Sequence, residues 1–132
     1  MPDLTKIVAV LDDEPEMRKA LRRLLTGCGF RVAEYTHGNE LFAAWDSFPI
    51  DCLLLDLHMM EISGFDVLET IRSRQIRVPV IVITAHDEPG TEERVRALGA
   101  AAYLRKPVDR DTLLAAIGTA IAHPPTLLPI AD

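Results

Sequence analysis

Two adjacent aspartates, Asp12 and Asp13, follow the apolar run IVAVL, and a third, Asp56, closes the run CLLLD. Carboxylates that share a crevice repel one another by roughly 4 kcal/mol per close pair at an effective dielectric constant of about 20, so such a cluster needs a cation. A few oxygen ligands open to water suit Mg²⁺, with Mn²⁺ as an alternative, whereas zinc or iron would use histidines or thiolates. The three aspartates are therefore candidate metal ligands.

Two further apolar runs end in residues that could act on a phosphoryl group. VIVI ends at Thr84, a neutral donor, and AAYLR leads into Lys106, a flexible point charge that can pair with a carboxylate or hold a phosphoryl oxygen. Aspartyl phosphates form when a metal and hydrogen-bond donors neutralise the incoming charge and align the attack. Asp56 is the predicted nucleophile because its apolar strand fixes its position, while Asp12 and Asp13 are better arranged to hold the ion.

These residues can meet only if the strands that carry them lie side by side. Short β-branched or leucine-rich runs alternate with amphipathic stretches of helical period, and the continuous apolar runs at 7–11, 52–55 and 80–83 are typical of strands covered on both faces. The pattern predicts an α/β fold, with a doubly wound, five-stranded parallel sheet of order 2-1-3-4-5 and five helices. Ligands of such sheets bind beyond the carboxyl ends of the strands, here around strands 1 and 3.

Capping residues predict where the helices begin and end. The first helix is expected to end at the glycines of the segment TGCG. Asn39 is a candidate N-cap of the second helix, and Asp109 or Asp111 is a candidate N-cap of the fifth.

The composition indicates one domain. A chain of 132 residues with 48% hydrophobic content can bury a sizeable core, and we expect a domain over residues 1–122 followed by a proline-containing tail or linker stub over 123–132. The net charge of −6 argues against direct contact with nucleic acid or an anionic membrane, and no apolar run approaches the roughly 20 residues of a membrane span. A cytoplasmic location is expected. Cys28 and Cys52 are predicted to pack as small hydrophobic residues.

Over about residues 5 to 122 the chain resembles a receiver domain of a two-component response regulator. Four segments carry the resemblance in order: VLDDEP, LLLDLHMMEISG, VIVITAHD and AAYLRKP. The resemblance implies that Asp56 accepts a phosphoryl group from the phosphohistidine of a sensor histidine kinase or phosphotransfer protein. It also implies a signalling switch that catalyses only its own phosphorylation and dephosphorylation.

The resemblance assigns roles around the metal ion. Asp13, Asp56 and the backbone carbonyl of His58 would bind Mg²⁺ directly, and Asp12 would act mainly through water. Met60 and Glu61 stand where the family usually has proline and glycine, so the loop is less constrained and carries an added negative charge.

A second group of residues would sense the phosphoryl group. By the same resemblance, Thr84 would turn towards it, Tyr103 would rotate inward behind Thr84, and Lys106 would pair with a phosphoryl oxygen. The bond between Lys106 and Pro107 is often cis in this family.

Two histidines flank the expected pocket. His58 follows Asp56 by two residues and His86 follows Thr84 by two, in loops that should border the pocket mouth. We hypothesise that they modulate dephosphorylation by controlling water access, with a dependence on pH between about 5 and 8.

Phosphorylation adds nearly two negative charges, which must bias an element that has two arrangements. The predicted output surface is the helix 4, strand 5, helix 5 face, residues 92–122, which would bind a downstream protein or form a self-dimer. A stand-alone receiver and a domain of a longer regulator both remain open.

Three rival classes of protein share part of this pattern. A phosphatase of the haloacid-dehalogenase type needs a second acid two residues after the nucleophile, where this chain has His58. A flavodoxin-like cofactor binder would offer glycines and free N–H groups after the first strand, where this chain has the acidic segment DDEPEM. A receiver that binds partners without phosphorylation would not need the full set of pocket residues.

Overall fold

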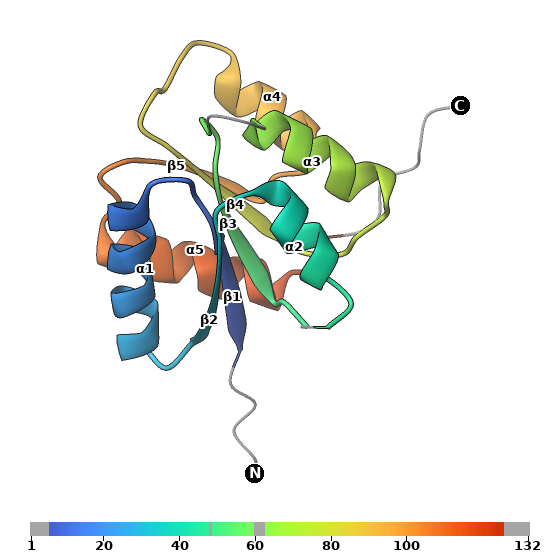
Figure 1. Ribbon diagram of the computed structural model, residues 1–132. Coiled ribbons are helices and arrows are strands. Elements are labelled where there is room, and N and C mark those ends of the chain that lie inside the picture. Colours follow the sequence, from blue (N-terminus) through green and yellow to red (C-terminus); the bar gives the residue numbers. More distant parts are fainter. Residues whose placement is uncertain (1–5, 48, 60–62, 126–132) are drawn as a thin grey trace.

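Five strands and five helices alternate along the described part of the chain, which comprises residues 6–47, 49–59 and 63–125 of the computed structural model. The sheet forms a middle layer between two helical layers (Figure 1). In chain order the elements are β1 Ile7–Leu11, α1 Pro15–Gly27, β2 Arg31–Tyr35, α2 Gly38–Ala44, β3 Cys52–Asp56, α3 Gly64–Ser73, β4 Val80–Thr84, α4 Thr91–Ala97, β5 Ala102–Arg105 and α5 Arg110–Ala122.

The sheet is entirely parallel, and its order is β2-β1-β3-β4-β5, as predicted. The register aligns the carboxyl ends of the central strands: Leu11 pairs with Leu55, and Asp56 pairs with Ile83. The polar residues that end β1, β3 and β4 therefore reach the same edge of the sheet.

Each face of the sheet has its own hydrophobic core. Alternate residues of β1, β3 and β4 point to opposite faces, as the pleat requires. On one face they pack with Leu41, Val67 and Val95 of α2, α3 and α4, and on the other with Leu25 and Leu113 of α1 and α5. Both faces are covered because every central-strand residue is apolar until the strand ends.

The helix ends mostly follow the predicted caps. Helix α1 ends at Gly27, and Asp109 caps α5 by accepting a hydrogen bond from the Thr112 backbone N–H at 3.0 Å. The prediction that Asn39 caps α2 is wrong, because α2 begins earlier, with His37 as its N-cap. Glu40 accepts the His37 backbone N–H at 3.0 Å, which completes a capping box.

Neither cysteine forms a disulfide: Cys52 is buried and Cys28 is half-buried. None of the helices in the described ranges has the length and apolar character needed to cross a bilayer.

Candidate functional site

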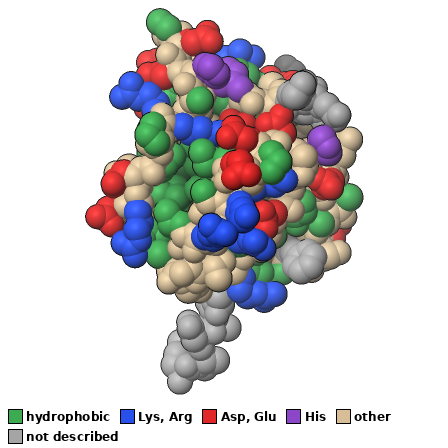
Figure 2. Space-filling view, turned by 60° about the vertical axis from the view of Figure 1, so that its left-hand side comes forward, with side chains coloured by type: hydrophobic (Ala, Val, Ile, Leu, Met, Phe, Trp, Pro, Cys, Tyr) green, Lys and Arg blue, Asp and Glu red, His purple; other side chains and the backbone are tan. Residues whose placement is uncertain are grey.

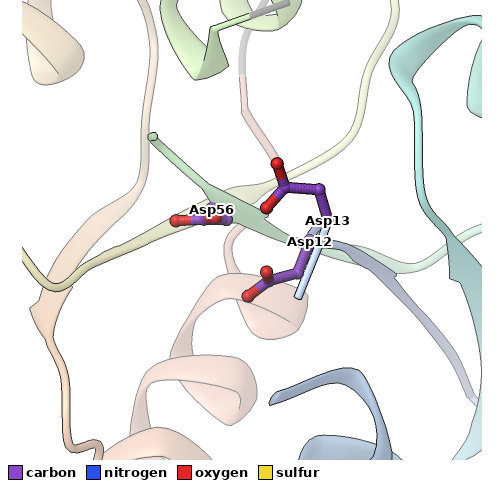
Figure 3. A group of neighbouring side chains, drawn as sticks. All are labelled: Asp12, Asp13 and Asp56. Carbon is purple, nitrogen blue, oxygen red and sulfur yellow. The ribbon is translucent and has the colours of Figure 1, made fainter. Parts of the chain in front are cut away.

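Three carboxylates lie together where β1 and β3 end. Asp12 and Asp13 directly follow β1, and Asp56 is the last residue of the neighbouring strand β3. One carboxylate oxygen of each residue lies within 4.8 Å of the others. Figure 3 shows the three side chains gathered beside the ends of the two strands. The parallel sheet thus brings together acids that are far apart in the sequence.

Asp56 occupies an unfavourable place for a charge. Asp56 is only 6% exposed. Burial, and after it repulsion from Asp12, raises the pKa of its carboxyl from 3.8 to about 6. Lys106 and the His58 backbone N–H, which lies 3.4 Å from Asp56 Oδ1, oppose this rise in pKa. The carboxylate is therefore ionised at neutral pH but poorly solvated, which favours its reaction with an electrophile.

Asp12 is buried and tied to the loop that follows β1. Its Oδ1 accepts a hydrogen bond from the Glu14 backbone N–H at 2.9 Å, and its backbone carbonyl accepts one from Nη1 of Arg18 at 2.7 Å. Arg18 belongs to α1, so the helix fixes the loop that presents Asp12 and Asp13.

Lys106 supplies the positive charge of the cluster. Its Nζ lies 3.2 Å from Asp12 Oδ2 and 3.6 Å from Asp56 Oδ1, and its side chain is 11% exposed. Its backbone N–H donates to the Thr84 carbonyl at 2.8 Å, which fixes it against the end of β4. The peptide bond between Lys106 and Pro107 is cis.

Thr84 is fully buried at the end of β4, and its hydroxyl bonds to the following loop. Thr84 Oγ1 donates to the His86 carbonyl at 3.2 Å and accepts the His86 backbone N–H at 3.0 Å. Because a hydroxyl has a single proton, the bond to the His86 carbonyl must break before this hydroxyl can donate to a group on Asp56.

Tyr103 is half-buried on β5, and its hydroxyl donates to Asp87 Oδ1 at 2.8 Å. Arg105 Nη1 lies 3.3 Å from the other oxygen of the same carboxylate. Burial, together with the hydrogen bond to Asp87, raises the pKa of Tyr103 to about 12, so this side chain is a neutral donor at physiological pH.

His58 and His86 lie against each other on the loops that follow β3 and β4. Their ring centroids are 5.2 Å apart, at an interplanar angle of 85°, and both residues are exposed. Figure 2 shows acidic and basic side chains close together in the middle of one face of the molecule, with histidine side chains above them and to their right.

The donors of the acidic cluster are all carboxylate oxygens. No histidine or cysteine joins Asp12, Asp13 and Asp56 in a metal-binding group among the described residues. Such a set suits a hard cation such as Mg²⁺ better than zinc or copper.

Comparison with known families agrees with this geometry. Residues 8–118 match the model of the response regulator receiver domain. The chain belongs to this family. It is accordingly a phosphoacceptor of a two-component system, a signalling switch rather than a classical enzyme.

Sequence relatives of this receiver include longer transcriptional regulators. It is 38% identical over 117 residues to the DNA-binding transcriptional regulator NtrC of Salmonella typhimurium, an alignment that covers 89% of this chain and 25% of the relative. It is 37% identical over 117 residues to the transcriptional regulatory protein KdpE of Mycobacterium tuberculosis, an alignment that covers 87% of this chain and 50% of the relative. The chain thus spans a quarter to a half of the length of these relatives.

Solved receivers have the same fold. The FixJ N-terminal structure superimposes with a TM-score of 0.83 at 30% identity, covering 93% of this chain and 97% of that one. Chemotaxis protein CheY4 of Vibrio cholerae superimposes with a TM-score of 0.80 at 24% identity, covering 87% of this chain and 98% of that one.

Three residues that support the receiver site were not predicted as such. Gly64 lies so close to β3 that an added Cβ would be 2.7 Å from Leu57 Cα and 2.9 Å from the Asp56 carbonyl. Arg18 holds the loop after β1, and Asp87 holds Tyr103. The glycine stands in the segment EISG, which was part of the resemblance, whereas the other two depend on contacts between separate elements.

Met60 and Glu61 lie outside the described residues. The predicted effect of these two residues on the metal site stays a prediction, as does the domain boundary at residue 122.

Proposed function

We propose that Asp56 is the phosphoacceptor of this receiver. A carboxylate oxygen of Asp56 forms the new O–P bond while the N–P bond of a donor phosphohistidine breaks, and the donor imidazole leaves with the electron pair and takes up a proton. Hydrolysis resets the switch, because water attacks phosphorus, inorganic phosphate leaves and the carboxylate is restored. The observation that carries this proposal is the buried Asp56 carboxylate among two other acids and Lys106.

The neighbouring residues have separate roles in this proposal. Asp13, Asp56 and the His58 carbonyl would hold Mg²⁺, and Asp12 would act through water. When bound there, the ion would supply positive charge against the phosphoryl oxygens. Lys106 pairs with a phosphoryl oxygen, because its Nζ already lies 3.6 Å from Asp56 Oδ1.

Thr84 and Tyr103 transmit the change. In this proposal Thr84 turns its hydroxyl from His86 towards the phosphoryl group, and Tyr103 rotates inward behind it. The affected surface is α4, β5 and α5, residues 92–122, which binds a downstream protein or a second receiver.

The family implies a histidine kinase as the partner that donates the phosphoryl group. We propose a cytoplasmic location, which is typical for receivers, and no direct contact of this chain with nucleic acid or membrane. The DNA-binding activity for which the NtrC relatives are named belongs to proteins four times the length of the matched region.

Incubation with acetyl phosphate and Mg²⁺ tests the proposal. The wild-type chain is expected to gain the mass of one phosphoryl group by intact mass spectrometry, and Asp56→Asn is expected to gain none. Asp46→Asn is the matched control, because Asp46 is an exposed aspartate outside the acidic cluster. Equal phosphorylation of wild type and Asp56→Asn would disprove the assignment.

We propose further that His58 and His86 modulate dephosphorylation. Their rings lie 5.2 Å apart, on the loops that follow Asp56 and Thr84, from where they would limit the approach of water. His58→Ala and His86→Ala are expected to change the rate of loss of the phosphoryl group by several-fold, measured by phosphate release. His123→Ala, at the end of α5, is the control. Unchanged rates in both variants would refute this role.

A further inference from the structure

Both side chains that are proposed to respond to phosphorylation bond to one short loop. Thr84 makes two hydrogen bonds with the backbone of His86, and Tyr103 donates to the side chain of Asp87. His86 and Asp87 are consecutive residues in the segment between β4 and α4. A change at either side chain therefore acts on the same two-residue segment, His86 and Asp87.

Asp87 connects this loop to β5 through two contacts. Its Oδ1 accepts the Tyr103 hydroxyl at 2.8 Å, and its Oδ2 lies 3.3 Å from Arg105 Nη1. The pair with Arg105 is exposed and therefore weak, whereas the bond from the half-buried tyrosine is short and has a charged acceptor. The hydrogen bond from Tyr103 is thus the stronger of the two contacts.

The loop arrangement held by Asp87 is the one that occupies the Thr84 hydroxyl. In this arrangement Thr84 Oγ1 donates its only proton to the His86 carbonyl, 3.2 Å away. To donate to a phosphoryl oxygen on Asp56, Thr84 must give up that bond and leave the His86 carbonyl without its hydroxyl donor. Contacts that hold residues 86 and 87 in place oppose this exchange.

We propose that Asp87 is a positioning residue that holds the loop after β4 in the unphosphorylated arrangement, and thereby limits the phosphorylation of Asp56. This inference rests on the proposed function of Asp56. A contact made in only one of two states shifts their equilibrium by its own free energy, so its loss favours the other state. Removing the Asp87 carboxylate therefore makes the phosphorylated arrangement easier to reach.

The test compares initial rates of phosphorylation by acetyl phosphate with Mg²⁺, followed by intact mass. Asp87→Ala is expected to react about three- to tenfold faster than wild type, within the range of ordinary coupling between sites. Asp87→Asn is expected to react at a rate between those of wild type and Asp87→Ala. Its amide oxygen can still accept a hydrogen bond from Tyr103 but carries no charge. Arg105→Gln, which removes only the weaker contact, is expected to give a smaller increase.

Glu88→Gln is the matched control. It removes the same charge from the next residue, whose carboxylate has no hydrogen bond or ion pair within the described part of the chain. A faster reaction caused only by weaker repulsion of the anionic donor would appear in Glu88→Gln as well. The proposal requires this control to stay within about twofold of wild type, as expected for an exposed charge.

A double-mutant comparison tests the route through Thr84. Thr84→Val keeps the β-branched shape but removes the hydroxyl that links β4 to His86. In that background Asp87→Ala is expected to change the phosphorylation rate by less than about twofold, because the two substitutions act on one linkage. A purely structural role of Asp87 would lower the thermal midpoint without raising the rate.

The outcomes separate the two proposals. If wild type takes up no phosphoryl group, or Asp56→Asn still takes it up, the assignment of Asp56 is wrong and this inference falls with it. If wild type is phosphorylated on Asp56 but neither Asp87 variant reacts faster, only the role of Asp87 is wrong. An equal acceleration in the Thr84→Val background overturns the proposed route.

Discussion

The side chain of Asp56 combines low exposure with a charge that its surroundings only partly stabilise. Its pKa is raised to about 6, first by burial and then by Asp12, while Lys106 opposes the rise. A structural role alone would favour a neutral residue at this position, because the apolar strand β3 could end in any residue that satisfies its backbone. The Asp56 carboxylate therefore lowers the stability of the fold, and its proposed reaction with a phosphoryl group explains why an acid stands there.

We expect Asp56→Asn to stabilise the metal-free protein. The folded-state pKa lies above the unfolded value, so the ionised carboxylate destabilises the fold above about pH 6, and this penalty fades as the pH falls towards the unfolded pKa. At neutral pH in EDTA the free energy of unfolding should rise by about 1–2 kcal/mol, measured by urea denaturation. The gain should shrink at pH 4.

Added Mg²⁺ provides the control for this prediction. An ion that binds only the folded state at one hundred times its Kd stabilises that state by about 2.7 kcal/mol, so Mg²⁺ should raise the stability of wild type far more than that of Asp56→Asn. A destabilised Asp56→Asn in EDTA would contradict the electrostatic account.

The site residues that the sequence predicted share one property: they end or directly follow an apolar strand. Asp12, Asp13, Asp56 and Thr84 could be found this way because parallel strands place their carboxyl ends at one edge. Asp87 could not, since its role depends on a hydroxyl from another strand across the loop. No sequence period indicates such a contact.

Helix α3 begins in direct contact with the end of β3. The Gly64 backbone N–H donates to the Leu57 carbonyl at 2.9 Å, and an added Cβ at this position would lie 2.7 Å from Leu57 Cα. Backbone atoms cannot move aside as flexible side chains do, so this close approach requires glycine. The helix therefore fixes the backbone immediately after Asp56.

Gly64→Ala should lower both stability and phosphorylation. The clash must move α3 or the end of β3, so we expect a loss of about 1–3 kcal/mol in urea denaturation and a slower reaction with acetyl phosphate. Gly118→Ala in α5 is the control, because an added Cβ there meets no atom within 4 Å and alanine favours helix. A tolerated Gly64→Ala would show that the contact is less strict than the distances imply.

The N-terminus of α5 offers a pH-dependent cap. Hydrogen bonds from the Thr112 backbone N–H and then the Thr112 hydroxyl lower the pKa of Asp109. The folded-state pKa is below the unfolded value, so the stabilisation is present above the unfolded pKa and is lost as the pH falls through the folded one.

Asp109→Ala is expected to lower the thermal midpoint by a few degrees at neutral pH, with a smaller difference near pH 3. Circular dichroism melts at both pH values check this. Asp111→Ala, which removes only a surface pair with Arg110 at 3.3 Å, should change the midpoint little. Equal effects of the two substitutions would contradict the capping role.

The helix N-caps could be predicted from the sequence only in part. Asp109 was one of two candidates because both aspartates precede an apolar run, and only the structure distinguishes them. Asn39 is a residue type that favours N-caps, but α2 begins earlier because Glu40 accepts hydrogen bonds from the backbone N–H groups of Thr36 and His37. Reciprocal contacts of this kind outweigh the intrinsic preference of a single residue.

The whole molecule depends on a sheet that is buried on both sides. Consecutive residues of β3 belong to different cores: Leu54 packs with α1 and α5, and Leu55 packs with α2, α3 and α4. Both are essentially unexposed. The continuous apolar runs predicted this two-sided burial, and with it the doubly wound order of the strands.

Leu54→Ala and Leu55→Ala should therefore each cost about 2–5 kcal/mol of unfolding free energy in urea denaturation. A sheet with one solvated face would tolerate one of the two. Lys19→Ala, at an exposed position of α1, should stay within about 0.5 kcal/mol of wild type. A mild effect at either leucine would mean that one helical layer is loosely packed.

The thiol of Cys52 lies in this buried strand, four residues before Asp56, with no exposed surface and a pKa raised to about 12, mainly by burial. Alkylating reagents attack the thiolate, so they can modify this sulfur only while β3 is transiently open. With Cys28 replaced by serine, the labelling rate would report how often the central strand separates from its neighbours. The chain thus carries an intrinsic probe of the opening of the strand that ends at Asp56, one that needs no added fluorophore.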